Sequence, residues 1–323
     1  MVFGKFLPFH KGHQAMIEFA AGGSERVLVC VCASQMETLP GKVRVGWMEE
    51  TFRGRKEIEL RLLEYNEEDL PNTSVSSRAV SEGWANKFKL FFPDVDHVVT
   101  SEPYGEFVAE FMGIPHRAFN PSRSLVPVSA TQIRADVGTH WDFLPDAVKR
   151  SYQQKVVLLG TESTGKSTLA KELAKQFGGV AVEEAGRDII PDSRKFSIED
   201  LHAVVEAQTN RVEAAMNLLR PLVFLDTDLH ITQSYAQFAF GTWMDLAKRH
   251  YEVQRADLYL YSSADAPFVQ DGTRMPAEQR MALDKRHWMT MLEFGLKLEI
   301  ISGNWNERRT MASEWVRKLK PKI

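Results

Sequence analysis

Short apolar runs alternate with longer amphipathic stretches along the whole chain. Strands that are buried on both faces appear as short apolar runs, so the first kind predicts strands and the second kind helices. A charged stretch, residues 57–65, fits neither pattern clearly. The alternation favours an α/β fold in which helices cover both faces of parallel sheets. The predicted strands are 26–34, 96–102, 156–160, 221–228, 255–263 and 296–302, and the predicted helices are 43–52, 81–92, 130–136 and 167–177.

Two segments, residues 1–13 and 155–178, have the pattern of a short strand, a glycine-containing turn and a helix. Each begins its own run of strands and helices, so we expect two doubly wound parallel-sheet domains. A chain of 323 residues also suggests two domains, at roughly 150 residues per domain. The polar stretch 141–155 is typical of a closing helix. We place the boundary near Ser151, which gives domains 1–150 and 151–323.

Composition excludes several classes of protein. Lys and Arg total 40 against 43 Asp and Glu, and neither half has the basic excess of a nucleic-acid-binding surface. No apolar run reaches the roughly 20 residues of a membrane span, and the N-terminus lacks the apolar core of a secretory signal. Cys30 and Cys32, the only cysteines, lie in an apolar run, which favours core positions in a reducing compartment. We expect a cytoplasmic protein that binds small molecules rather than nucleic acid or membranes, and self-association into a homo-oligomer stays open.

A phosphate-binding loop is the strongest signal in the second half. Gly160, Gly165, Lys166 and Ser167 fit the pattern GxxxxGK[ST], with an apolar strand before the loop and a helix after it. Backbone N–H groups of such a loop point at phosphates, and the helix N-terminus adds positive potential. We expect Lys166 to reach the β- and γ-phosphates of a nucleotide and the Ser167 hydroxyl to ligate Mg²⁺.

Charged side chains downstream of the loop suit phosphoryl transfer. Asp226 and Asp228 end a buried strand, at the edge where α/β sheets bind ligands. One carboxylate is expected to hold Mg²⁺ and the other to accept the proton of the acceptor hydroxyl, in an order that the sequence leaves open. Arg274 and Arg280 lie in a predicted loop and helix start, where they can close over a transferring phosphoryl group.

A further charged segment, residues 183–190, follows a strand-like run. It holds Glu183, Glu184, Arg187 and Asp188. The segment is either a salt-bridge cluster at a helix start or a wall of the acceptor site, and the pattern alone does not decide between them.

The N-terminal turn provides a second candidate site. His10 and His13 lie at the start of a predicted helix. Two histidines do not make a zinc site, which needs at least one further ligand. Imidazole N–H groups beside a helix N-terminus can instead bind the α-phosphate of a nucleotide and its leaving pyrophosphate. Ser129 and Thr131 start another predicted helix with Arg134 on its first turn, so we expect this helix start to face the same triphosphate.

These motifs resemble known ones. GKFLPFHKGH, residues 4–13, is similar to the GxFxPxHxGH signature of nucleotidylyltransferases, and VSATQIR, residues 128–134, is similar to their second motif. Such a domain followed by a P-loop kinase resembles the NadR-type bifunctional proteins, which combine nicotinamide mononucleotide (NMN) adenylyltransferase with nicotinamide riboside kinase. GTESTGKST, EEAGRD, FLDTDLHIT and FVQDGTR resemble the kinase half of that family.

The resemblance implies roles for individual residues. In a Rossmann-like N-terminal domain, the catalytic groups would be His10, His13 and Arg134. ATP and NMN would be bound by Gly4, Lys5, Phe6, Pro8, Gly12, Arg44, Trp84, Ser129 and Thr131, with Trp84 either stacking on nicotinamide or packing in the core. In the kinase domain the catalytic groups would be Lys166, Asp226 and Asp228, with Mg²⁺ on Ser167 and one of the two aspartates. ATP would be bound by Gly160, Thr161, Glu162, Ser163, Thr164, Gly165, Ser167, Thr168, Arg274 and Arg280, and the riboside by Glu184, Arg187 and Asp271.

The implied activity is a two-step salvage of the pyridine nucleotide. Nicotinamide riboside and ATP would give NMN, and NMN and ATP would then give NAD and pyrophosphate, both with Mg²⁺. Some family members begin with a helix-turn-helix segment, which we do not expect here because only three residues precede Gly4. The first predicted strand is short as well, since it has only the three residues 1–3. Three alternatives stay open: a kinase with a weak or silent adenylyltransferase domain, the same two enzyme folds acting on other acceptors, and a non-catalytic nucleotide sensor.

Overall fold

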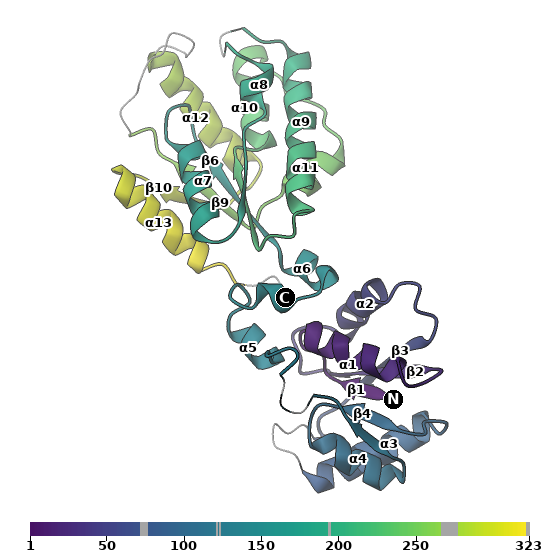
Figure 1. The fold of residues 1–323 in the computed structure, drawn as a ribbon. Coiled ribbons are helices and arrows are strands. Elements are labelled where there is room, and N and C mark those ends of the chain that lie inside the picture. The colour runs from purple at the N-terminus through teal and green to yellow at the C-terminus, as the bar shows by residue number, and fades with distance from the viewer. Residues whose placement is uncertain (72–76, 121, 123, 193–194, 266–276, 321–323) are drawn as a thin grey trace. The chain divides into compact units, whose positions relative to one another are not determined.

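Two parallel five-stranded sheets organise the chain, one in residues 1–151 and the other in residues 152–322 (Figure 1). The structure is a computed structural model and describes residues 1–71, 77–120, 122, 124–192, 195–265 and 277–320. The predicted α/β architecture with parallel sheets is confirmed in both halves. No helix among these residues is both long enough and apolar enough to cross a membrane.

In the first unit the strand order is β3–β2–β1–β4–β5. The chain runs outward from β1 in both directions, so the end of β1 lies at the point where the strand order reverses. β1 has only three residues, yet it pairs with β2 on one side and with β4 on the other. The short first strand therefore takes the central place in the sheet. The elements are β1 (Val2–Gly4), α1 (Lys11–Ala21), β2 (Val27–Ser34), α2 (Gly41–Thr51), β3 (Ile58–Tyr65), α3 (Arg78–Phe91), β4 (Val98–Thr100), α4 (Tyr104–Met112), β5 (His116–Ala118), α5 (Ala130–Ala135), the 3₁₀ helix η1 (Trp141–Phe143) and α6 (Asp146–Tyr152).

Helices cover both faces of this sheet, with α3 and α4 on one face and α1 and α2 on the other (Figure 1). Cys30 and Cys32 are buried and form no disulfide in the core under α3 and α4, as the apolar run around them predicts. The charged stretch that fitted neither pattern is β3, at the edge of the sheet. Its Glu59 pairs with Arg26 and Arg61. Charged side chains on an edge strand discourage pairing with another chain, which explains the mixed pattern.

The second unit has the strand order β10–β9–β6–β8–β7, with β6 at the centre. Because β6 lies between β8 and β9, the loop that follows it lies between their carboxyl ends, where parallel sheets bind ligands. Helices α7 and α13 pack on one face of the sheet, and α9, α10 and α12 pack on the other (Figure 1). The elements are β6 (Gln154–Leu159), α7 (Lys166–Gln176), β7 (Val180–Val182), α8 (Gly186–Ile189), α9 (Ile198–Met216), β8 (Leu222–Asp226), α10 (Leu229–Phe240), α11 (Lys248–Gln254), β9 (Leu258–Ser262), α12 (Ala277–Glu293), β10 (Leu298–Ile301) and α13 (Trp305–Arg317).

Candidate active sites

The loop between β1 and α1 holds the two histidines of the first unit. His10 is the N-cap of α1, and its Nδ1 accepts a hydrogen bond from the Gly12 N–H at 3.0 Å. Since Nδ1 accepts, this hydrogen-bond network assigns the proton of the neutral ring to Nε2. The His10 ring stacks on His13 with centroids 3.7 Å apart, and Phe6 packs edge-on against His13 at 5.0 Å. A Cβ atom at Gly12 would lie 2.9 Å from His10 Cε1, so this close approach requires glycine.

The segment that leads into α5 lies against this loop, as the second motif predicts. Arg134 donates through Nη1 to the Leu7 carbonyl and through Nη2 to Thr131 Oγ1, the latter at 3.1 Å. Ser129 caps α5 and forms a capping box with Gln132. Ser129 is thus engaged in its own helix, whereas Thr131 and Arg134 are exposed beside the histidine loop. The positive charge at this point comes from Arg134, because a helix of six residues adds little dipole of its own.

An acidic residue that the sequence analysis did not single out, Glu37, joins two of the predicted cations. Its Oε1 lies 2.8 Å from Lys5 Nζ and its Oε2 lies 2.5 Å from Arg44 Nη2. Arg44 is completely buried and also donates to the carbonyls of Lys5 at 2.6 Å and Cys32 at 3.4 Å. The contact between Arg44 and phosphate that the resemblance implied does not fit this burial. Arg44 instead supports the backbone of the loop from behind, while the Lys5 side chain remains 35% exposed.

The remaining predicted residues of the first unit have packing roles in the structure. Trp84 packs edge-on against Tyr65 at 4.8 Å and lies 5.5 Å from Phe88. These contacts fit the expectation that Trp84 packs in the core, although its side chain is only half-buried. Gly4 is the last residue of β1, and Pro8 is buried in the loop that follows.

The phosphate loop of the second unit follows β6 and requires glycine at two positions. Gly160 has φ +127°, and a Cβ atom there would lie 2.4 Å from the Ser262 carbonyl oxygen. Gly165 has φ +83°, and its Cβ atom would lie 2.7 Å from the Trp305 ring. Both conformations are in the left-handed region that favours glycine. The loop therefore fits tightly between β9 and α13.

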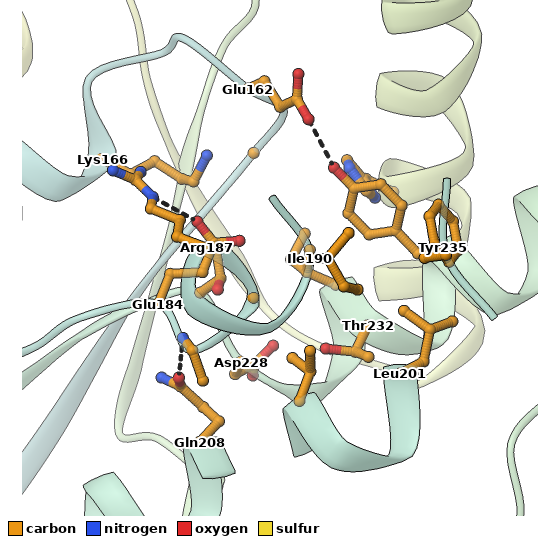
Figure 2. Close-up of a pocket in the computed structure, with 18 of the residues that line it drawn as sticks. Glu162, Lys166, Glu184, Arg187, Ile190, Leu201, Gln208, Asp228, Thr232 and Tyr235 are labelled. Atoms are coloured by element: carbon orange, nitrogen blue, oxygen red, sulfur yellow. Dashed lines mark hydrogen bonds and ion pairs between the residues drawn. The ribbon is translucent and has the colours of Figure 1, made fainter. Parts of the chain in front are cut away.

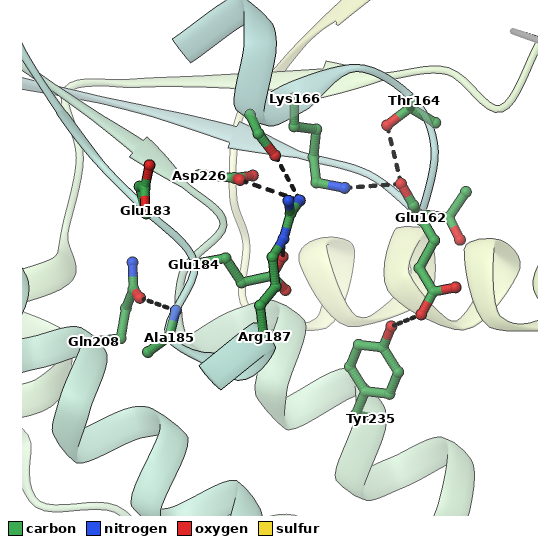
Figure 3. A network of polar contacts seen from close by, with 12 residues as sticks. Glu162, Thr164, Lys166, Glu183, Glu184, Ala185, Arg187, Gln208, Asp226 and Tyr235 are labelled. Carbon is green, nitrogen blue, oxygen red and sulfur yellow. Dashed lines mark hydrogen bonds and ion pairs between the residues drawn. The ribbon is translucent and has the colours of Figure 1, made fainter. Parts of the chain in front are cut away.

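Lys166 begins α7 and reaches back over the loop. Its Nζ donates to the Thr161 carbonyl at 2.8 Å, and Thr164 Oγ1 donates to the same carbonyl at 2.9 Å (Figure 3). Arg280, on α12, is buried and donates through Nε to the Glu162 carbonyl at 3.0 Å. The structure thus brings one of the two predicted lid arginines to the loop. The other, Arg274, and the predicted riboside ligand Asp271 lie outside the described residues. Of the other loop residues, Ser163 lines the cavity described below and Thr168 is exposed on α7.

The two aspartates after β8 have different surroundings. Asp226 is 2% exposed, and among the described residues its Oδ1 has no hydrogen-bond partner. Asp228 is the N-cap of α10, where Oδ1 accepts from the His230 N–H at 3.0 Å and Oδ2 lies 2.7 Å from His230 Nδ1. A carboxylate oxygen and the Ser167 hydroxyl are ligands that Mg²⁺ accepts, so the residues present fit the metal. The described part of the chain contains no group of three or more His, Cys, Asp or Glu side chains placed to hold a metal, so nucleotide oxygens would complete the set.

Arg187 and Glu184 connect these groups. Arg187 Nη2 lies 2.5 Å from Ser167 Oγ and 3.5 Å from Asp226 Oδ2, and its Nε donates to Glu184 Oε2 at 3.2 Å (Figure 3). Burial raises the pKa of Glu184, while the charges of Lys166 and Arg187 oppose that rise. The neighbouring acids of the same segment point elsewhere: Glu183 pairs with Lys171, and Asp188 pairs with Arg211. The segment is therefore both a salt-bridge cluster and a wall of the site.

A cavity of about 300 Å³ opens beside the phosphate loop (Figure 2). Its polar wall combines Glu184 and Asp228 with Gln208, which accepts a hydrogen bond from the Ala185 N–H at 2.9 Å. His287 also lines the cavity, and burial together with the charges of Lys166 and Arg286 lowers its pKa to about 3, so the ring is neutral. No sequence motif marks Gln208, Tyr235 or His287, since each lies within a helix, α9, α10 and α12 respectively. The apolar wall consists of Ile190, Pro191, Phe196, Leu201, Val204, Ile231 and Tyr235.

Comparisons with known proteins agree with these observations. Residues 155–308 match the family described as an AAA domain. The trifunctional NAD biosynthesis/regulator protein NadR of Escherichia coli (strain K12) is 26% identical over 316 residues, which cover 90% of this chain and 74% of that protein. The protein of the same name from Salmonella typhimurium (strain LT2) is 26% identical over 298 residues, covering 85% and 71%.

Solved structures give the same result. A crystal structure of NadR protein in complex with NAD and AMP-PNP superimposes with a TM-score of 0.64 at 26% identity, covering 98% of this chain and 94% of the other. A NadR protein in complex with NR, at 24% identity, shares the fold with a TM-score of 0.65 over 98% and 95% of the two chains. These similarities extend over both sheets, so the chain is similar to NadR proteins over nearly its whole length.

Proposed function

We propose that the second unit phosphorylates nicotinamide riboside with ATP to give NMN, and that the first unit joins NMN to the adenylyl group of a second ATP to give NAD and pyrophosphate. The observation that carries the first step is the cavity of about 300 Å³ beside Lys166, which lies within the size range of small-molecule sites. Its apolar wall suits a flat ring, and its polar wall suits a ribose. The name of the relatives and the NAD and AMP-PNP held by one of their structures support the same assignment.

Phosphoryl transfer here depends on positioning and charge neutralisation. The riboside 5′-hydroxyl attacks the γ-phosphorus of ATP, and the bond to the β-phosphate oxygen breaks. Lys166 would leave the Thr161 carbonyl for the phosphates, and the backbone N–H groups of the loop would hold them. Ser167 and Asp226 would hold Mg²⁺, which neutralises charge on the phosphate oxygens.

We assign the proton acceptor to Glu184 rather than to Asp228. Glu184 lines the cavity, and burial raises its pKa, which makes it a better base near neutral pH. Asp228 also lines the cavity, but both of its oxygens are engaged with His230. Its role is to fix the start of α10 and the cavity wall that this helix contributes.

Adenylyl transfer in the first unit needs no protein nucleophile. A phosphate oxygen of NMN attacks the α-phosphorus of ATP, and pyrophosphate leaves. His10, with its proton on Nε2, and His13 would donate to the α-phosphate at the start of α1, an eleven-residue helix. Lys5 and Arg134 would neutralise the departing pyrophosphate.

The test supplies ATP and Mg²⁺ with nicotinamide riboside or NMN in separate reactions and separates the products by chromatography. NMN from the riboside and NAD from NMN are the expected products. Failure of the second reaction alone would refute the assignment of the first unit, and failure of both would show that the acceptors are different compounds.

A further inference from the structure

The guanidinium of Arg187 lies between the two side chains that suit a divalent cation. Its Nη2 is 2.5 Å from Ser167 Oγ and 3.5 Å from Asp226 Oδ2 (Figure 3). The remaining oxygen of Asp226, Oδ1, is buried without a hydrogen-bond partner among the described residues. One cation of the protein itself thus donates a hydrogen bond to Ser167 and forms an ion pair with Asp226.

A metal ion and this guanidinium would compete for the same two side chains. Mg²⁺ binds oxygen ligands at about 2.1 Å, so an ion on Ser167 Oγ would lie beside the guanidinium of Arg187, whose Nη2 is 2.5 Å from the same oxygen. Both groups are positively charged, so they repel each other when both lie beside Ser167 and Asp226. This repulsion opposes binding of the metal while Arg187 keeps these contacts, and movement of Arg187 away from them relieves it.

The surroundings of Arg187 allow it to leave. It lies on α8, a single turn of four residues, and its side chain is 62% exposed. The backbone just before the turn is anchored separately, because the Ala185 N–H donates to Gln208 Oε1 at 2.9 Å. Arg187 also borders the acceptor cavity and contacts Glu184, so a small rotation keeps it at the site after its contacts with Ser167 and Asp226 are broken.

We propose that Arg187 is an exchangeable counter-cation of the metal site: it neutralises Ser167 and Asp226 until a divalent cation, delivered with the nucleotide, displaces it towards the acceptor cavity. This inference rests on the proposed function only in taking Ser167 and Asp226 as the metal ligands. It predicts that the full-length protein binds a divalent cation weakly when no nucleotide is present, and that removing the charge of residue 187 strengthens that binding.

The experiment measures Mn²⁺ binding to the full-length protein without nucleotide, from the electron paramagnetic resonance signal of unbound Mn²⁺. Arg187→Gln is expected to bind one Mn²⁺ roughly tenfold more tightly than the unmodified chain, the change that corresponds to one charge-assisted hydrogen bond. Arg187→Lys retains the charge and is expected to bind like the unmodified chain. Arg211→Gln is the matched control, since Arg211 contacts Asp188 and the Glu183 carbonyl but neither metal ligand.

The site of the added affinity is tested by combining Arg187→Gln with Asp226→Asn, which should abolish it. Equal or weaker Mn²⁺ binding by Arg187→Gln would overturn the proposal, and so would a gain that survives Asp226→Asn. Neither result depends on the acceptor, so a chain that fails to phosphorylate nicotinamide riboside but shows the Mn²⁺ effect would refute the proposed function and leave this inference standing.

Discussion

Replacing Gly12 by alanine tests whether the histidine loop performs the chemistry of the first unit. The new Cβ atom would lie 2.9 Å from His10 Cε1 and 3.0 Å from Nδ1, whereas ordinary contact begins at 3.4 Å. The ring must therefore move by about half an ångström. Because a displacement of 1 Å at a reacting centre can cost about 10²-fold in rate, we expect a loss of about tenfold in the rate of NAD formation.

The effect should be confined to catalysis in one unit. Gly12 is the second residue of α1, where alanine gains about 0.5–1 kcal/mol over glycine, so the variant is expected to fold. Gly46, in α2, is the matched control, because a Cβ atom there meets nothing within 4 Å. The assay compares NAD formed from NMN with NMN formed from nicotinamide riboside for Gly12→Ala, Gly46→Ala and the unmodified chain.

Unchanged NAD formation by Gly12→Ala would refute the idea that His10 must be held in this position. Loss of both activities by a variant that still unfolds cooperatively would refute the independence of the two sites. Loss of NAD formation in Gly46→Ala would show that the assay responds to any change in the first unit.

Three further predictions concern single side chains. Lys166→Ala should abolish NMN formation from the riboside and leave NAD formation from NMN intact, and His13→Ala should do the reverse. Chromatography of the products measures both activities, and a variant that loses both activities would contradict the two-site scheme. Glu184→Gln should lower the rate of riboside phosphorylation by about 10²-fold or more if Glu184 is the base. Burial raises the pKa of Glu184 in the folded protein, so the stability that protonated Glu184 contributes is present below its unfolded-state pKa and is lost as pH rises through its folded-state pKa. Glu184→Gln should therefore be more stable than the unmodified chain at neutral pH, and the difference in stability should shrink on acidification. The melting temperature of both proteins against pH tests this. Arg44→Met should destabilise the first unit by about 3 kcal/mol in urea unfolding, because it removes the buried cation from Glu37 and leaves it with Lys5 and a long hydrogen bond from the Ser34 N–H. An unchanged unfolding midpoint would show that the Arg44–Glu37 pair contributes nothing.

Much of the fold follows from local pattern. The apolar runs around Val29, Leu158, Leu225 and Leu260 are central strands, because only side chains buried on both faces give uninterrupted apolar runs. The pattern does not reveal β5, because its three residues, His116–Ala118, do not form an apolar run. The predicted closing helix over 141–155 is instead a 3₁₀ turn and the seven-residue α6, and β6 already begins at Gln154. Boundaries of this kind depend on tertiary contacts that no local pattern records.

The candidate sites could be predicted to the extent that they lie on contiguous loops. Backbone geometry links Gly160 to Lys166 and His10 to Gly12, so a short pattern identifies these residues together. The cavity wall is different, because Gln208 and Tyr235 come from two separate helices and meet the loop only when the sheet has formed. The same limit applies to Arg44, since its position in the sequence does not show that Glu37 lies at 2.5 Å and that solvent is excluded.

Asp226 and Asp228 show how one residue changes the chemistry of a pair. In a continuous strand, residues two apart project from the same face, so the spacing predicts two equivalent carboxylates. The strand ends at Asp226, and Thr227 turns with φ +65°. That turn makes Asp228 the cap of α10 and commits both of its oxygens to His230, while Asp226 keeps one oxygen without a partner in the described chain. This difference is the reason that we propose Asp226 for the metal and assign the base to Glu184, which lies just after β7 and lines the same cavity.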